Sequence, residues 1–74
     1  PMEHEFENEF RMVGLKVAFY RKAKNLTQEQ LAEKLGTSTS YIGSIESKTY
    51  KPISLTTLFR IAKVLDVPSY KFLE

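Results

Sequence analysis

The chain has no cysteine and only one histidine, and its apolar runs are short. Without cysteine it has neither a disulfide nor a thiolate metal site, so its 74 residues must be stabilised by helix packing, aided where needed by a partner chain. A membrane-spanning helix needs about 20 consecutive apolar residues, and the acidic N-terminus lacks the basic and then apolar order of a signal peptide. These absences favour one soluble cytoplasmic domain that does not interact with a membrane.

The same scarcity of reactive side chains argues against an enzyme. The one histidine, His4, stands among glutamates near the N-terminus, where neither a metal ligand nor a catalytic base is expected. No pair of carboxylates is set among apolar residues, as general acid–base catalysis requires, and no group of side chains has the spacing of metal ligands. We therefore expect no catalytic residue, no metal ion, no cofactor and no small-molecule ligand.

Acidic side chains are concentrated at the N-terminus, where four of the nine stand at alternate positions from Glu3 to Glu9. Residues 10–74 therefore hold eleven basic against five acidic side chains, a net charge of +6. That balance suits a polyanionic partner such as nucleic acid, although many small domains without one are equally basic. We divide the chain into an acidic arm over residues 1–9, with the proline before the first methionine as an expression remnant, and a domain over residues 10–74.

The arm has two interpretations. Phe6 and Phe10 stand four residues apart, which predicts an added turn of helix that packs on the domain or on a second subunit. Leu15 and Phe19, on another face of the same helix, would extend that contact. The alternative is a disordered arm. In either case its glutamates would repel DNA, which excludes a basic arm of the minor-groove type.

Apolar periodicity and polar caps predict a compact all-α domain of five short helices, without strands or repeats. Thr27, Ser38 and Ser54 are the expected N-caps, and Gln30 completes a capping box with Thr27. The predicted helices run from Phe6 or Phe10 to Ala23, from Thr27 to Leu35, from Ser38 to about Ser47, from Ser54 to Leu65, and from Tyr70 to Leu73.

Residues 27–46 have the pattern of a helix-turn-helix, in which two short helices cross closely and the second can enter the DNA major groove. Ala32 is small enough for the crossing, and Gly36 fits a turn position with positive φ. Apolar residues make up the rest of the predicted helix-turn-helix core. The full core consists of Leu31, Ala32, Leu35, Gly36, Ile42 and Ile45. The alternative is a plain helical hairpin with the same pattern.

Three motifs resemble the Cro/CI-like helix-turn-helix regulators, or XRE family. They are NLTQEQLAEKLG at residues 25–36, YIGSIE at residues 41–46, and LxxLxxxAxxLxVP at residues 55–68. The resemblance covers about residues 13–73 and implies the five-helix fold of the lambda-repressor-like domains. Within the family, the SYIGSIE segment and the short length are similar to the controller proteins of restriction–modification systems.

The resemblance implies roles for individual residues at the DNA. Arg21 and Glu46 would form a structural ion pair between the first helix and the end of the third; the alternative for Arg21 is a solvated side chain or a phosphate contact. The expected base-facing side chains are Thr39, Ser40 and Ser44. The expected contacts to the DNA backbone are Gln28, Tyr41, Lys48, Tyr50 and Lys51. The alternative for the two lysines is a solvated loop, and the family often has glycine where Lys48 stands.

The chain departs from what the resemblance leads us to expect at the residues that would recognise the DNA sequence. The predicted third helix contains no Arg, Lys, Asn or Gln before Lys48, so the side chains that read guanine or adenine through two hydrogen bonds are missing. Specificity would then depend on DNA shape and deformability, or a modest affinity would be compensated by dimerisation.

The C-terminal end is more apolar than a terminal turn requires. In the family this end often forms a dimer interface, here Val67, Pro68, Tyr70, Phe72 and Leu73. The alternative is that Phe72 and Leu73 only cap the core. We therefore predict a small homodimeric transcriptional regulator, either an activator or a repressor, that binds double-stranded DNA sequence-specifically. The alternative is a protein-interaction module on the same fold, such as an antitoxin or a protein that binds a repressor.

Overall fold

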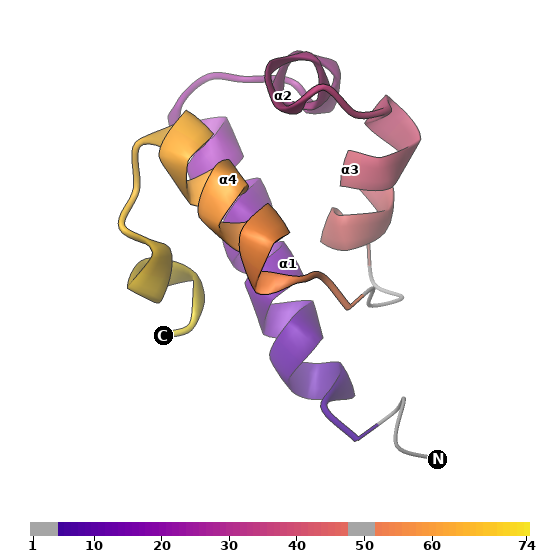
Figure 1. Ribbon diagram of the computed structural model, residues 1–74, viewed down its shortest axis with the longest axis vertical. Helices are drawn as coiled ribbons and strands as arrows, with labels where there is room; N and C mark the ends of the chain where they lie inside the picture. The colour runs from indigo at the N-terminus through magenta and orange to yellow at the C-terminus, as the bar shows by residue number, and fades with distance from the viewer. Residues whose placement is uncertain (1–4, 48–51) are drawn as a thin grey trace.

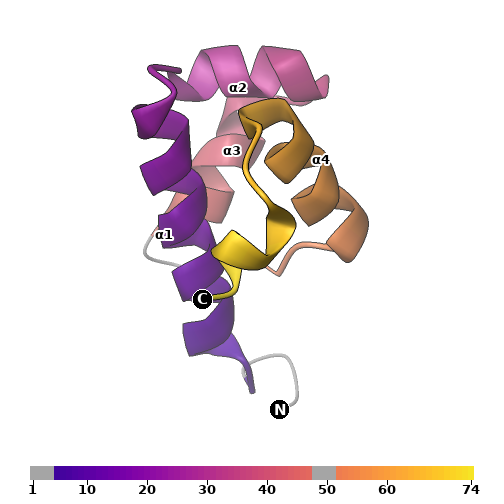
Figure 2. The same cartoon turned by 90° about the vertical axis from the view of Figure 1, so that its left-hand side faces the viewer.

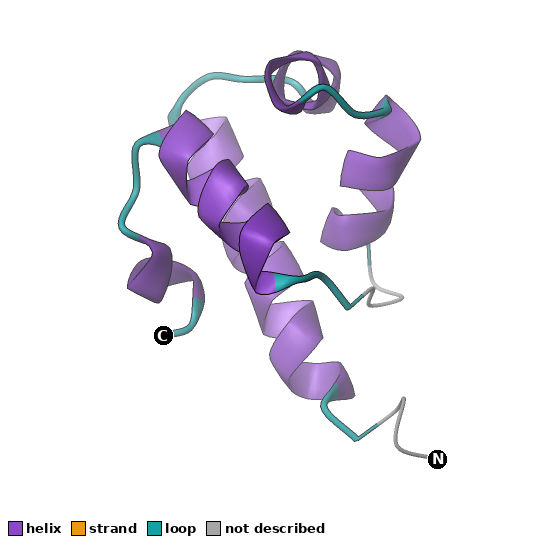
Figure 3. Ribbon diagram, viewed as in Figure 1, coloured by secondary structure: helices purple, strands orange, loops and turns teal. Residues whose placement is uncertain are grey.

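The computed structural model describes residues 5–47 and 52–74, and over these residues the chain is all-α (Figure 1 and Figure 3). The elements are α1 (Glu7–Ala23), α2 (Gln28–Leu35), α3 (Thr39–Glu46), α4 (Leu55–Leu65) and the short 3-10 helix η2 (Ser69–Phe72). The all-α class and the order of the elements are as predicted. The fifth element differs in kind, because it is a 3-10 helix rather than an α-helix. None of the described helices is long and apolar enough to cross a membrane.

Polar side chains begin the three short α-helices where the sequence predicted. Thr27 Oγ1 accepts a hydrogen bond from the Gln30 backbone N–H at 3.0 Å, and Gln30 Oε1 accepts from the Thr27 N–H at 2.8 Å, which completes the capping box. Ser38 Oγ and Ser54 Oγ cap α3 and α4 by accepting from the backbone N–H three residues on, each at 3.1 Å and without the reciprocal bond. These caps satisfy backbone donors that a helix cannot pair internally.

Residues in the left-handed backbone region follow three of the helices, α1, α2 and α4, whereas α3 ends at Ser47 in extended backbone. Gly36 has φ +72° directly after α2, as predicted, and Asp66 has φ +56° directly after α4. Asn25, with φ +59°, turns the chain between α1 and α2. Glycine and short polar residues adopt this region at least cost, so the turns follow from the residue types.

The helices enclose one apolar core. In Figure 1, α2 lies across one end of the molecule, α4 crosses in front of α1, and α3 and η2 lie on opposite sides; Figure 2 shows the same opposition, with η2 in front and α3 behind. The buried apolar side chains come from all five elements. They are Val13, Val17, Leu31, Ala32, Leu35, Ile42, Ile45, Leu58, Ile61, Ala62, Leu65 and Phe72.

The two ends of the chain pack on this core differently from one another. Residues 7–9, assigned to the arm, already belong to α1, which agrees with the interpretation of an added helical turn. Phe72 is 1% exposed and packs edge-to-face on Tyr20, with 5.2 Å between the ring centroids. Phe72 is therefore a core residue, as the alternative of a core cap predicted. Its assignment to a dimer interface is corrected, because η2 packs against both α1 and α4 and buries the ring there.

Candidate nucleic-acid interface

The helix-turn-helix consists of α2, the turn at Gly36 and α3. Leu31, Ala32 and Leu35 of α2 are buried, as are Ile42 and Ile45 of α3. Ala32 is 1% exposed, so a longer side chain there would push the neighbouring helix away. These apolar residues and the glycine turn lie where the predicted helix-turn-helix core requires them.

The outward face of α3 carries small polar side chains. Helical periodicity places Ser40 opposite Ile42 and Ile45, and both Thr39 and Ser40 are exposed. Ser44 is half-buried, and its hydroxyl donates to the Tyr41 carbonyl at 2.7 Å. The Ser44 oxygen still accepts hydrogen bonds, and Thr39 and Ser40 are more exposed than Ser44.

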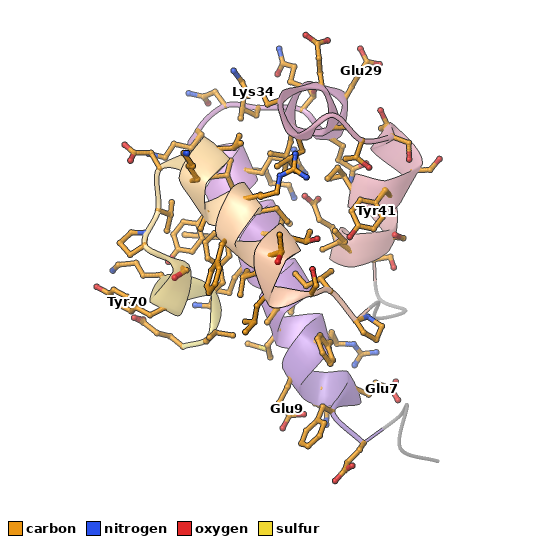
Figure 4. The ribbon with its side chains drawn as sticks, viewed as in Figure 1. Glu7, Glu9, Glu29, Lys34, Tyr41 and Tyr70 are labelled. Atoms are coloured by element: carbon orange, nitrogen blue, oxygen red, sulfur yellow. The ribbon has the colours of Figure 1, made fainter. Side chains whose placement is uncertain are left out.

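The predicted contacts to the DNA backbone fall into two groups. Tyr41, labelled on α3 in Figure 4, is half-buried and packs against the core. Lys48, Tyr50 and Lys51 lie outside the described residues. The described part of the chain therefore places Tyr41 closer to the core than expected, and the loop contacts remain predictions.

Arg21 and Glu46 form the ion pair that the resemblance implied. Arg21 Nε and Nη2 donate to the two carboxylate oxygens of Glu46 at 2.8 and 3.0 Å, and Nη1 donates to the Leu26 carbonyl at 2.7 Å. The side chains of Arg21 and Glu46 are only 9% and 4% exposed. The pair therefore joins α1, the α1–α2 turn and the end of α3, and the alternative of a solvated Arg21 is wrong.

Gln28 is also part of this cluster, which the sequence did not indicate. Its Nε2 donates to Glu46 Oε1 at 3.1 Å, so the first residue of α2 is bonded to the last residue of α3. Among the described residues, no buried side-chain nitrogen or oxygen lacks a hydrogen-bond partner. The amide is thus held by Glu46 before any ligand is present.

Gly14 is a second residue that sequence reasoning missed. A Cβ placed there would overlap the Ile45 carbonyl oxygen and lie 3.2 Å from its carbon. α1 and α3 therefore approach backbone to backbone at this point. The available signal was a glycine between the buried Val13 and Val17 of an amphipathic helix, a position where glycine costs helix stability and so indicates close packing.

Charge is distributed unevenly around the helix-turn-helix. α3 has no basic side chain, and its one acid, Glu46, is paired with Arg21. Figure 4 shows Glu7 and Glu9 at the opposite end of the molecule from α2, which carries Glu29 and Lys34 on its outer side. The acidic first turn of α1 is therefore kept away from the start of α2.

The apolar C-terminal end borders a groove on the side of the molecule away from α3. Tyr70 and Leu73 are 61% and 65% exposed, Pro68 is exposed and Val67 is half-buried. The groove has a volume of about 470 Å³. Its lining residues are Phe6, Glu9, Phe10, Met12, Val13, Phe72, Leu73 and Glu74. The described residues contain no group of His, Asp or Glu side chains that would hold a metal ion.

The comparison with known sequences agrees with this geometry. The profile described as Helix-turn-helix (HTH_3) matches residues 17–72, most of the chain. The chain belongs to this helix-turn-helix family, the XRE family of Cro/CI-like domains.

Two curated relatives are regulators. The transcriptional regulator SinR of Bacillus subtilis is 36% identical over 63 residues, which cover 85% of this chain and 57% of SinR. The control protein C.SmaI of Serratia marcescens is 46% identical over 57 residues, covering 77% of this chain and 67% of that protein. The chain thus spans little more than half the length of SinR.

Solved structures match most of the chain. SinR in complex with DNA superposes with a TM-score of 0.77 and 35% identity, covering 84% of this chain and 98% of that one. The restriction–modification controller protein C.AhdI of Aeromonas hydrophila superposes with a TM-score of 0.79 and 29% identity, covering 88% and 97% of the two chains. The resemblance to the XRE family, and within it to controller proteins, is confirmed.

Proposed function

We propose that the chain is a transcriptional regulator that binds double-stranded DNA sequence-specifically, with α3 in the major groove. The observation that carries the proposal is the exposed polar face of α3, held against α1 by the Gly14 contact and the Arg21–Glu46 pair. The SinR domain, solved in complex with DNA, supports it by similarity. Such a protein works where the DNA is, which we expect to be the cytoplasm.

Thr39 and Ser40 are the proposed base-facing side chains, with Ser44 as an acceptor. Hydroxyl groups pair with any base, and the Thr39 methyl group fits the methyl of thymine. Because each such contact discriminates weakly, we propose that DNA shape and deformability supply a large part of the specificity. The proposed backbone contacts are Gln28, Tyr41, Lys48, Tyr50 and Lys51.

The proposal is tested by selecting bound DNA from a random duplex pool at near-physiological salt. A palindromic consensus with half-sites about one helical turn apart is expected for a two-fold dimer. The affinity for random duplex should fall with salt by about 0.9 log units per phosphate contact per log unit. Absence of both enrichment and salt dependence would exclude the proposed function.

Homodimerisation is part of the proposal. One small module makes few phosphate contacts, whereas two copies related by symmetry bind with a high effective concentration. Tyr70 and Leu73 are large apolar side chains that are mostly exposed, which supports a second copy at this end.

A protein-interaction module is the second candidate. The apolar groove between α1 and the C-terminal residues favours it, because such grooves accept apolar side chains of a partner. A chain that binds no DNA but keeps its fold would support this candidate instead.

A further inference from the structure

We propose that Glu46 is a positioning residue for DNA binding, which orients the Gln28 amide toward a phosphate as well as pairing with Arg21. This inference rests on the proposed function. Its basis is the hydrogen bond of 3.1 Å from Gln28 Nε2 to Glu46 Oε1, together with the two bonds from Arg21 to the same carboxylate.

The chemistry of the two groups fixes the orientation of the amide. A carboxylate only accepts hydrogen bonds, so Glu46 selects the amide orientation in which nitrogen, and not oxygen, faces it. An amide nitrogen has two N–H groups, and the bond to Glu46 uses one of them. The second N–H remains to donate to a phosphate oxygen. The opposite orientation would leave two acceptors, the amide oxygen and Glu46, facing each other.

Space around the amide agrees with this orientation. Gly43 has no side chain, and a Cβ added to it would lie 3.6 Å from the amide oxygen of Gln28. A neighbouring residue with a polar side chain at this position would compete with Glu46 for the amide. Glycine leaves the amide with Glu46 as its partner among the described residues.

Arg21 makes this arrangement compatible with DNA. An unpaired carboxylate beside the start of α2 would repel a phosphate. The guanidinium binds both oxygens of Glu46 and neutralises the charge locally. Arg21 thus acts on the DNA through Glu46 and Gln28, without reaching a phosphate itself.

The first test is a double-mutant cycle measured as affinity for a mixed-sequence DNA duplex, per folded molecule. In the natural chain, Gln28→Ala should weaken binding about tenfold, the effect of a hydrogen bond to a charged acceptor. In a Glu46→Gln chain the same change should cost less than about twofold, because residue 46 then has a single acceptor oxygen, which the two guanidinium donors of Arg21 occupy in place of the Gln28 amide. A purely structural role for Glu46 would lower the melting temperature and leave the cost of Gln28→Ala unchanged.

The matched control is Glu29→Gln, which removes an exposed carboxylate from the same first turn of α2. It should raise the affinity for DNA slightly through charge, and the cost of Gln28→Ala should remain about tenfold in its presence. Equal costs in the Glu46→Gln chain and in the natural chain would overturn the inference while leaving DNA binding intact. No effect of Gln28→Ala in the natural chain would also overturn it, by removing Gln28 from the phosphate.

A second measurement uses the natural chain and so does not depend on whether a variant folds. The nuclear relaxation of the Gln28 side-chain NH₂ group should show it as ordered as the backbone without DNA, and unchanged when duplex is added. The NH₂ group of Gln30 is the internal comparison. Gln30 makes its capping-box bond through the amide oxygen, so its NH₂ group is not held by that bond as the Gln28 NH₂ group is held by Glu46. A Gln28 amide that is mobile in the free chain would overturn the inference.

Discussion

Gly14 lies where α1 passes the carbonyl end of α3. Because a Cβ there would overlap the Ile45 backbone oxygen, Gly14→Ala must displace α3 rather than a flexible side chain. We expect the free energy of unfolding to fall by about 3 kcal/mol, the cost of overpacking at backbone. Chemical denaturation measures it.

Gly43 provides the control for this change, since it is also a glycine within a helix. A Cβ at Gly43 would meet only Gln28 Oε1, at an ordinary contact distance of 3.6 Å. Gly43→Ala should therefore leave stability unchanged or raise it by up to about 1 kcal/mol through helix propensity. Equal destabilisation by the two substitutions would contradict the close approach at Gly14.

Arg21→Ala is expected to act on the fold more than on DNA binding. It leaves the Glu46 carboxylate, whose side chain is 4% exposed, without its charged partner, at a cost of about 3 kcal/mol. The melting temperature should fall markedly, while the affinity for DNA per folded molecule should fall only modestly, because the Glu46 carboxylate beside Gln28 is no longer neutralised. A stable variant with a large loss of affinity would instead make Arg21 a phosphate contact.

At the residue scale, the sequence predicted what depends on local pattern. The capping box, the glycine at positive φ and the Arg21–Glu46 pair were all expected, the last through resemblance. Gln28 bonding to Glu46 and Gly14 touching Ile45 were not, because each depends on how closely two helices approach. Such an approach distance is set by the whole core and cannot be obtained from spacing in the sequence.

The α3 helix is the element that should determine base preference. Thr39→Ala and Ser40→Ala remove exposed groups from its outward face and should each change the preference among sequences by about 1 kcal/mol or less, with little change on random DNA. Thr56→Ala, at an exposed threonine in the first turn of α4, should change neither. Selection of bound DNA with each variant measures the preference. An equal loss on specific and random DNA would refute the base-facing assignment.

At the element scale, the predicted boundaries of α2, α3 and α4 agree with the structure. Each helix begins at a polar cap; α2 and α4 end at Gly36 and Asp66 in the left-handed region, and α3 ends at Ser47 in extended backbone. The last element was harder to predict. Pro68 precedes it, and only four residues, Ser69–Phe72, are helical, which is too short for α-type hydrogen bonding to be favoured over a 3-10 turn. The same short helix places the Phe72 ring in the core, so the alternative that Phe72 caps the core agrees with the structure.

The whole molecule has two faces that we assign to different partners, α3 to DNA and the C-terminal end to a second copy. Figure 2 shows η2 and α3 on opposite sides of the α1–α4 pair, so both faces can be occupied at once. Leu73→Asp places a charge on a side chain that is 65% exposed and outside the core. We expect a folded monomer whose binding to a two-fold site is weakened, because the second half-site no longer benefits from effective concentration.

Leu15→Asp is the matched control for this change. Leu15 is 52% exposed on α1 and does not line the groove beside Leu73. Sedimentation equilibrium should show a dimer for the natural chain and for Leu15→Asp, and a monomer for Leu73→Asp. If Leu15→Asp alone dissociated the dimer, the interface would lie on the outer face of α1. The apolar groove and Tyr70 would then be available to a different protein partner. The dimer that binds the two-fold DNA site would be joined through the outer face of α1.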